Sequence, residues 1–206
     1  MRLHFYILLG SIIFSFSSCS QLKQPKLNAY ALSVEKHRTS IHKDMLSEEH
    51  PFNKEQKSKF IGFDYFPANE SFKTIAELKF KKETEAINMV TSDGKTRKYL
   101  DVANLQFELQ NQTYTLHLYQ SIDGNHYFLP FTDETNGVSS YGGGRYLDIE
   151  SQSIKGNTLE LDFNLCYNPY CAFVEGYSCP IPPRNNHLNI KLEAGVKYQK
   201  TVFTDK

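Results

Sequence analysis

The chain has 206 residues, with 23 basic and 23 acidic side chains and a formal net charge of zero. Proteins that bind nucleic acid usually carry a basic patch, so this balance gives no support for a nucleic-acid partner. Hydrophobic residues make up 40% of the chain and aromatic residues 14%, which is enough for a folded core and excludes a globally disordered protein. A chain of this length is typical of one domain.

The N-terminus has the pattern of an export signal. Arg2 precedes an apolar run from Phe5 to Phe16, interrupted only by Gly10, Ser11 and Ser15. A spanning helix needs about 20 apolar residues, so this run is too short to anchor the chain permanently in a bilayer. A basic residue, a short apolar core and small residues after it are typical of a secretory signal peptide.

The end of that run resembles the lipoprotein box of bacteria, in which small residues precede a cysteine that receives a diacylglyceryl group. The segment here is Phe16-Ser17-Ser18-Cys19, with Phe where Leu is usual. The resemblance implies a signal peptide over residues 1–18, acyl chains such as palmitate on Cys19, and a polar tether over residues 19–28. We therefore expect a lipoprotein anchored to a membrane of the bacterial cell envelope and facing the periplasm. A secreted protein with an incidental Cys19 is the alternative.

The segment after the tether predicts a helix over residues 29–50. Its apolar residues Leu32, Val34, Ile41, Met45 and Leu46 fall roughly on one side, and charged residues occupy the other. Asn28 is expected to cap the start, and Pro51 to help end the helix.

From Phe72 onward, hydrophobicity alternates with a period of two, which is typical of half-buried antiparallel strands. The alternating apolar residues are Ala76, Leu78 and Phe80; Leu105, Phe107 and Leu109; Leu116 and Leu118; Leu159, Leu161 and Phe163; and Leu188, Ile190 and Leu192. Turn signals lie between them at Asp93-Gly94, Asn111-Gln112, Asp123-Gly124 and Gly156-Asn157. These patterns predict a single, mainly β domain over residues 29–206, an antiparallel β-sandwich or small barrel-like domain with an N-terminal helix.

Residues 133–188 hold longer motifs. They include Asp133-Glu134-Thr135-Asn136-Gly137, Tyr141-Gly142-Gly143-Gly144-Arg145-Tyr146-Leu147-Asp148, Asp162-Phe163-Asn164-Leu165-Cys166-Tyr167-Asn168-Pro169-Tyr170-Cys171-Ala172 and Cys179-Pro180-Ile181-Pro182-Pro183-Arg184-Asn185-Asn186. In this order they resemble domain-of-unknown-function family 1684, over Phe60 to about Lys197. The resemblance implies no established activity. Cys166 stands where that family usually has Ala, and Asn185 where it usually has Glu.

Each motif also has an interpretation from its residues alone. The glycines before Arg145 lack the G-x-G-x-x-G and G-K-[ST] spacings of phosphate loops, which favours a turn with positive φ or close backbone approach. The functional alternative is an anion-binding nest with Arg145 as a bidentate clamp. The Asp133 segment favours an Asx-type turn, with a catalytic Asp133 as the alternative.

We expect a small polar or anionic ligand, a glycan or an envelope partner to bind within residues 133–188, without a cofactor. The candidate ligand-binding residues are Asp133, Tyr141, Arg145, Asp162, Asn164, Tyr167, Asn168, Arg184 and Asn186, with tyrosines such as Tyr146 and Tyr170 as apolar walls. A hydrolase that uses Asp133 or Asp162, with Arg145 binding an anion, is the alternative, and its catalytic residues are otherwise unknown. A purely structural envelope component is the third hypothesis.

The cysteines beyond Cys19 have three interpretations. A disulfide between Cys171 and Cys179 is favoured outside the cytoplasm and leaves Cys166 as a buried thiol. Zinc bound by Cys171, Cys179 and His187 is the second, although the C-x7-C-x7-H spacing fits no standard zinc motif. A nucleophilic Cys171 or Cys179 with His187 as base is the third. A protein without a metal is the expectation.

Overall fold

The computed structural model describes residues 28–50, 52–122, 126–199 and 202–203. The predicted signal peptide, the lipidation site Cys19 and nearly all of the tether lie outside these residues. Pro51 and the Asp123-Gly124 turn lie outside them too.

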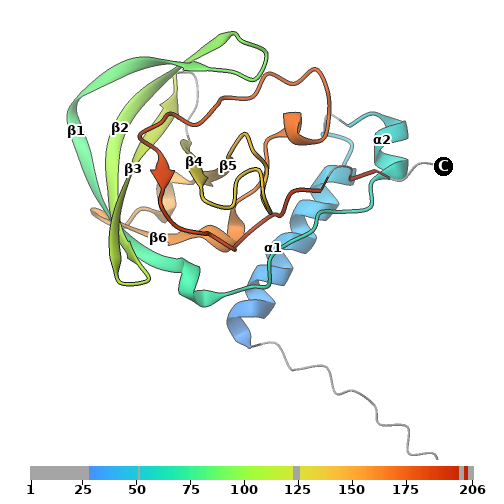
Figure 1. Ribbon diagram of the computed structural model, residues 1–206, viewed down its shortest axis with the longest axis horizontal. Helices are drawn as coiled ribbons and strands as arrows, with labels where there is room; N and C mark the ends of the chain where they lie inside the picture. Colours follow the sequence, from blue (N-terminus) through green and yellow to red (C-terminus); the bar gives the residue numbers. More distant parts are fainter. Residues whose placement is uncertain (1–27, 51, 123–125, 200–201, 204–206) are drawn as a thin grey trace, which may run out of the picture.

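Seven strands form one sheet in the order β5-β4-β3-β2-β1-β6, and β7 pairs with β4. The sheet is curled into a half-barrel (Figure 1). The strands are β1 (Lys73–Val90), β2 (Thr96–Leu109), β3 (Gln112–Ser121), β4 (Tyr127–Asp133), β5 (Arg145–Ile149), β6 (Thr158–Asp162) and β7 (His187–Leu188). All neighbouring strands are antiparallel except β7, which runs parallel to β4. The predicted mainly β domain with antiparallel strands is confirmed.

Period-two hydrophobicity builds the core on one face of this sheet. Ala76, Leu105, Leu116 and Leu161 are completely buried in one cluster, together with Phe163 just beyond β6. Most of the apolar residues predicted to point inward therefore do so. Phe80 does not, since 46% of its surface is exposed next to an irregularity in the β1–β2 pairing.

A tight turn joins β2 to β3 one residue earlier than predicted. Leu109 pairs with Gln112, so the two-residue turn is Gln110-Asn111, with φ angles of 49° and 62°. A two-residue hairpin turn of this hand needs positive φ at both central positions, which asparagine tolerates well.

The apolar alternation from Leu188 to Leu192 is not a full strand. Only His187 and Leu188 pair with β4, and the chain then folds into successive tight turns in which the amides of Ile190 and Ala194 bond to carbonyls two residues earlier. Leu192 is nevertheless completely buried. The alternation thus predicted the burial of these side chains correctly. Their backbone amides, however, bond to nearby carbonyls of the same segment and not to a neighbouring strand.

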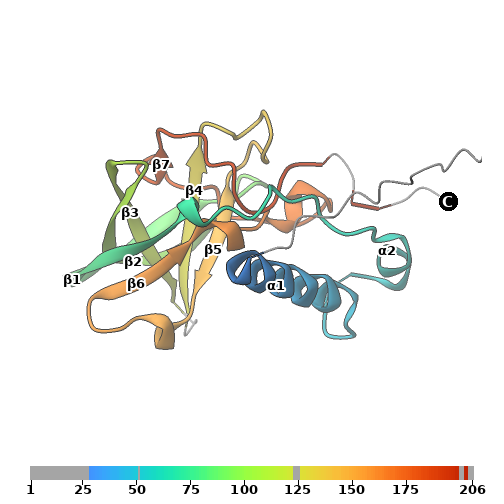
Figure 2. The ribbon, with the colours of Figure 1, turned by 90° about the horizontal axis from the view of Figure 1, so that it is seen from below.

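An N-terminal helix, α1 (Ala29–Leu46), packs beside the sheet near β5 and β6 (Figure 2). The Asn28 side chain caps it by accepting a hydrogen bond from the Ala31 amide at 2.7 Å, as predicted. The helix ends four residues earlier than expected. A second, unpredicted helix, α2 (Lys54–Lys59), follows it. In the described ranges, no helix is long and apolar enough to cross a membrane.

Short 3₁₀ turns and a second apolar cluster complete the molecule. The turns are η1 (Glu70–Phe72), η2 (Ser151–Ser153), η3 (Phe163–Leu165) and η4 (Tyr170–Ala172). The cluster contains Met45, Phe52, Phe60 and Val202, and it joins the end of α1 to the C-terminal segment. It holds the end of α1 at a point that is separate from the main core.

Candidate functional site

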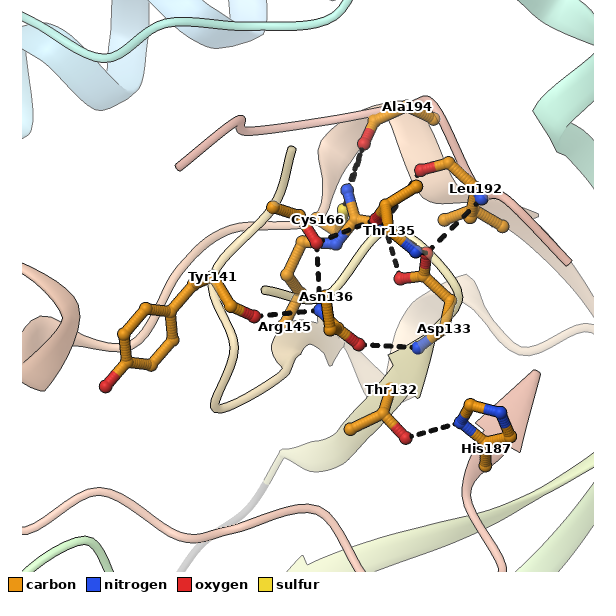
Figure 3. A network of polar contacts seen from close by, with 11 residues as sticks. Thr132, Asp133, Thr135, Asn136, Tyr141, Arg145, Cys166, His187, Leu192 and Ala194 are labelled. Carbon is orange, nitrogen blue, oxygen red and sulfur yellow. Dashed lines mark hydrogen bonds and ion pairs between the residues drawn. The ribbon is translucent and has the colours of Figure 1, made fainter. Parts of the chain in front are cut away.

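Asp133 and Arg145 form an ion pair in the core. Asp133 ends β4, Arg145 begins β5, and Nη2 of Arg145 lies 2.7 Å from Oδ2 of Asp133 (Figure 3). Neither side chain has any exposed surface. Replacing one partner of a buried pair leaves the other charge unpaired, so this contact is important for the stability of the loop that joins the two strands.

Both terminal nitrogens of Arg145 donate hydrogen bonds within the protein. Nη1 donates to the carbonyl of Ala194, and Nη2 also donates to the carbonyl of Leu192 at 2.8 Å. The rings of Phe66 and Phe131 lie within 5.9 Å and 5.6 Å of the guanidinium carbon. The predicted role of Arg145 as a clamp for a bound anion is therefore corrected: it holds the C-terminal segment against the sheet.

The Asp133 segment is the predicted Asx turn. Oδ1 of Asp133 accepts hydrogen bonds from the Thr135 amide at 2.8 Å and the Thr135 hydroxyl at 2.6 Å (Figure 3). At the other end of the loop, Gly144 has a φ of +89°, and a Cβ there would lie 2.5 Å from Pro182. The turn needing positive φ and close approach is therefore confirmed, and it positions Arg145 rather than a ligand.

Two predicted ligand-binding asparagines, Asn164 and Asn186, hydrogen-bond to backbone groups. Asn186 is completely buried; its Nδ2 donates to the carbonyls of His117 and Pro130 at 2.8 Å, and its Oδ1 accepts from the His117 amide at 2.7 Å. Asn164 bonds in the same way to the amide and carbonyl of Asn69, at 2.9 Å each. These side chains join separate segments of the fold.

Arg184 and Tyr141 also lie away from the other predicted residues. Arg184 is exposed on the segment before β7. Tyr141 lines a small cavity beside Cys171. The structure therefore divides the predicted site residues between the core, the surface and two separate cavities.

A cleft of about 1130 Å³ lies between α1, the sheet and residues 164–180. Four of the predicted ligand-binding residues line it: Asp162, Asn164, Tyr167 and Asn168. Tyr146 and Tyr170, which were predicted as apolar walls, line it too. Its volume is slightly above the range of roughly 300–1,000 Å³ that is typical of small-molecule sites. Asp133 and Arg145 do not line it, so the three residues of the hydrolase alternative do not surround one pocket.

Asp162 connects the cleft to the helix. The Tyr30 hydroxyl, on α1, donates to its two carboxylate oxygens at 3.0 and 3.1 Å, and Oδ1 also accepts from the Asn164 amide at 2.9 Å. Burial, followed by the nearby Asp162 carboxylate, raises the pKa of Tyr30. Tyr30 thus stays protonated and holds α1 to the end of β6.

A second carboxylate, Asp148 on β5, makes the most distinctive polar contact in the cleft. The Tyr167 hydroxyl donates to Oδ2 of Asp148 at 2.6 Å, and the Tyr167 ring packs edge-to-face on Tyr146. Asp148 is accessible to solvent, yet the protein around it raises the pKa of its carboxyl by desolvation. Burial and the Asp148 carboxylate raise the pKa of Tyr167. Tyr167 is therefore a hydrogen-bond donor that fixes Asp148.

Aromatic rings form the wall around this pair. Tyr99, Phe128 and Tyr146 line the cleft and are each less than 9% exposed. Phe128 stacks on Tyr99 with ring centroids 5.4 Å apart, and contacts Tyr146 at 4.8 Å. The arrangement places one oriented carboxylate in an aromatic surface, which is suited to binding a molecule with an apolar face and a hydrogen-bond donor.

Asn168 adds an acceptor to the same cleft. Its Nδ2 donates to the Lys197 carbonyl at 3.0 Å, whereas its Oδ1 is buried without a hydrogen-bond partner among the described residues. A buried acceptor left without a donor is unfavourable. A ligand that supplies a donor near Asn168 would remove that cost.

Asp148 is not among the site residues predicted from sequence, although it ends the motif that begins at Tyr141. On β5, Arg145, Leu147 and Ile149 are buried, and Asp148 faces away from them. Tyr146 and Asp148 alternate with these core residues, so the signal was a strand with a buried tyrosine and a carboxylate on its second face.

The cysteines Cys166, Cys171 and Cys179 are free thiols in the structure, so the predicted Cys171–Cys179 disulfide is not present. Nδ1 of His187 lies 2.9 Å from the Thr132 hydroxyl, beside the pairing of β7 with β4 (Figure 3). Throughout the described ranges, no three His, Cys, Asp or Glu side chains are grouped as a metal site. Cys166 is a buried thiol, as predicted.

Comparisons with known proteins give a family and a fold. The model of a family described as "protein of unknown function (DUF1684)" matches residues 58–197. The solution NMR structure of an uncharacterised protein from Haloarcula marismortui is similar, with a TM-score of 0.63 and 33% identity. That match covers 81% of this chain and 92% of the other. No curated protein matches the chain.

Proposed function

We propose, for a chain that belongs to the DUF1684 family of proteins of unknown function, that the cleft between α1 and the sheet binds a small molecule. The ligand is neutral or cationic, has an apolar face and carries hydrogen-bond donors, as sugars and aromatic amines do. The observation that carries the proposal is the hydrogen-bonded pair of Asp148 and Tyr167 within an aromatic wall.

The charges of the cleft support a ligand that is not an anion. The acidic side chains that line it are Asp44, Asp148, Glu150, Glu160 and Asp162, and the basic ones are Arg97 and Lys98. Burial lowers the pKa of His37, another lining residue, so it adds no charge at neutral pH. The excess of carboxylates repels anions and attracts cations. This narrows the predicted ligand from polar or anionic to neutral or cationic.

Ligand-observed NMR tests the charge of the ligand. Saturation-transfer difference spectra are recorded for phenethylamine, methyl glucoside and phenylacetate with the purified protein. Phenethylamine and phenylacetate have similar aromatic bodies and opposite charges. We expect saturation transfer to phenethylamine, methyl glucoside or both, and much less to phenylacetate. Stronger transfer to phenylacetate, or none to any of the three, contradicts the proposal.

Two matched variants locate the interaction. Asp148→Asn removes the charge of the acceptor, and a charged hydrogen bond contributes about 1.5–3 kcal/mol, so phenethylamine should bind about tenfold or more weakly. Glu83→Gln is the control, because Glu83 is exposed on β1 and does not line the cleft. An equal effect of the two variants on phenethylamine contradicts a role for Asp148.

We propose further that the chain is a lipoprotein of the bacterial cell envelope, held at a membrane by acyl chains on Cys19 and facing the periplasm. The short apolar run and the Phe16-Ser17-Ser18-Cys19 box support this. Metabolic labelling with radioactive palmitate tests it. The wild-type chain should carry the label in the membrane fraction, and Cys19→Ala should lose it. A label that persists in Cys19→Ala contradicts the assignment.

A further inference from the structure

Two cysteines from different turns of the chain meet at the edge of the cleft. Cys171 lies in η4 and Cys179 lies eight positions later, and the Cys171 amide donates to the Cys179 sulfur at 3.3 Å. Cys171 is half-buried and Cys179 is 8% exposed. The hydrogen bond shows that the two residues are in contact as thiols, without a covalent bond.

The two cysteines line different cavities. Cys179 lines the large cleft, whereas Cys171 lines a second cavity of about 360 Å³ together with Ser92, Tyr141 and Tyr177. A small molecule that enters the second cavity can therefore reach Cys171, whereas Cys179 does not line that cavity. This is the geometry of an attacking thiol with a second thiol in reserve.

The surroundings of Cys171 favour its thiolate. The Cys179 thiol, and to a smaller extent the hydroxyls of Ser92 and Tyr141, lower the pKa of Cys171 to about 6. The Tyr141 oxygen lies 3.9 Å from the Cys171 sulfur. The neighbouring Cys171 raises the pKa of Cys179, and burial raises the pKa of Cys166. Of the three, Cys171 is therefore the nucleophile at neutral pH.

We propose that Cys171 and Cys179 form a thiol–disulfide exchange site that reacts with low-molecular-weight disulfides. The Cys171 thiolate attacks one sulfur of the disulfide, forming a mixed disulfide and releasing one thiolate. Cys179 then attacks the Cys171 sulfur, and its proton passes to the second departing thiolate. The two protein thiols are oxidised to a disulfide, and the small disulfide is reduced to two thiols.

The proposal does not depend on ligand binding in the large cleft. It requires only a thiolate at Cys171, a second thiol in contact with it and a cavity that admits the reagent. Cys166 cannot take the place of either residue, because it is 1% exposed and its sulfur lies 3.6 Å from the Ala194 carbonyl in the core. Cys166 is therefore the matched control.

Mass spectrometry with peptide mapping tests the exchange. The reduced full-length chain is treated with hydroxyethyl disulfide, and the products are mapped to individual cysteines. The wild-type chain should lose two hydrogens as the Cys171–Cys179 disulfide forms. Cys179→Ser should instead accumulate a mixed disulfide on Cys171. Cys171→Ser should form neither product, and Cys166→Ser should behave as the wild type.

Three results would overturn the proposal. One is a stable mixed disulfide on Cys171 in the wild-type chain, and another is an adduct on Cys179 in Cys171→Ser. The third is a Cys171–Cys179 disulfide that dithiothreitol reduces only after the protein is unfolded, which would mean a structural bridge. A measurement on the wild-type chain avoids variants that fail to fold. Alkylation of Cys171 by iodoacetamide should have its pH midpoint near 6, and a midpoint near 9 contradicts the account.

Discussion

Asp133 and Arg145 lie twelve positions apart and form an ion pair in which neither side chain reaches solvent. The Arg145 guanidinium group bonds to Asp133, at the start of the loop between β4 and β5. It also donates to the carbonyls of Leu192 and Ala194. At the level of sequence both residues are candidate ligand-binding residues in motifs that favour turns. Their role in the fold is to fasten the C-terminal segment over the core, and this leaves the cleft to other residues.

The buried ion pair of Asp133 and Arg145 should contribute more to the free energy of unfolding than an exposed ion pair does. Arg145→Met leaves the Asp133 carboxylate buried without its partner, and we expect the free energy of unfolding to fall by about 3–5 kcal/mol. Lys95→Met breaks an ion pair with Asp93 in which Lys95 is 80% exposed, and should change stability by less than about 1 kcal/mol. Urea unfolding followed by circular dichroism measures both. Equal effects of the two variants would contradict the account.

Gly144 should not tolerate a side chain. A Cβ at Gly144 would meet Pro182 at 2.5 Å and the Phe131 carbonyl at 2.8 Å, and its φ of +89° is unfavourable for alanine. We expect Gly144→Ala to destabilise the fold by more than about 1 kcal/mol. Gly142→Ala is the control, since a Cβ there has no contact closer than 3.7 Å. The same melting temperature for both variants in thermal unfolding would contradict this prediction.

The neighbouring asparagines Asn185 and Asn186 should differ strongly. Asn186→Ala leaves buried backbone groups of His117 and Pro130 without partners, each at a cost of about 1–3 kcal/mol. Asn185 is exposed and accepts only a long hydrogen bond of 3.4 Å from the Tyr119 hydroxyl. Asn185→Ala should therefore have little effect. The free energies of unfolding of the two variants provide the comparison, and a larger loss in Asn185→Ala would be evidence against the assigned contacts.

Much of the fold could be predicted from alternation, and the exceptions have physical reasons. β4 (Tyr127–Asp133) was missed because four consecutive residues in it are buried, so no period of two is visible. The segment after Leu188 does alternate in burial, but its backbone bonds to itself. Side-chain burial can be read from a local pattern, whereas the choice of hydrogen-bond partner depends on distant segments.

The candidate site was harder to predict because its walls come from distant segments. Asp162, Asn164, Tyr167 and Asn168 do line one cleft, as the alternation in β6 and the following motif suggested. The opposite wall is α1, more than a hundred positions away, and no sequence pattern indicates that contact. One motif contains both Arg145, which stabilises the fold, and Asp148, which lines the cleft. The motif alone therefore does not show which of the two residues lies at the candidate site.

The charge of Asp148 should lower the free energy of unfolding at neutral pH, although the proposed ligand needs that charge. Desolvation by the surrounding protein raises the pKa of Asp148 in the folded state above the unfolded value, so its contribution to stability is greatest below the unfolded pKa and is lost as pH rises through the folded pKa. Asp148→Asn removes the charge and retains an oxygen that accepts from Tyr167. The variant should therefore gain stability over the wild type as pH rises from about 4 towards 7.

Urea unfolding across that pH range measures the gain. Glu83→Gln is the control, because Glu83 lies on β1 and does not line the cleft. An Asp148→Asn chain that is less stable than the wild type at pH 7, relative to pH 4, would contradict the assigned environment. A more stable variant that binds phenethylamine less well would identify Asp148 as a residue retained for binding.

The most direct test of the central claim is to locate a bound probe on the protein. Backbone amide shifts are assigned by NMR, and phenethylamine is titrated into the labelled chain. The account predicts shifts concentrated at Asp148 on β5 and at Tyr167 and Asn168, with smaller shifts on the facing side of α1. Shifts concentrated outside the cleft, for example around the exposed Arg184, would contradict ligand binding between the helix and the sheet.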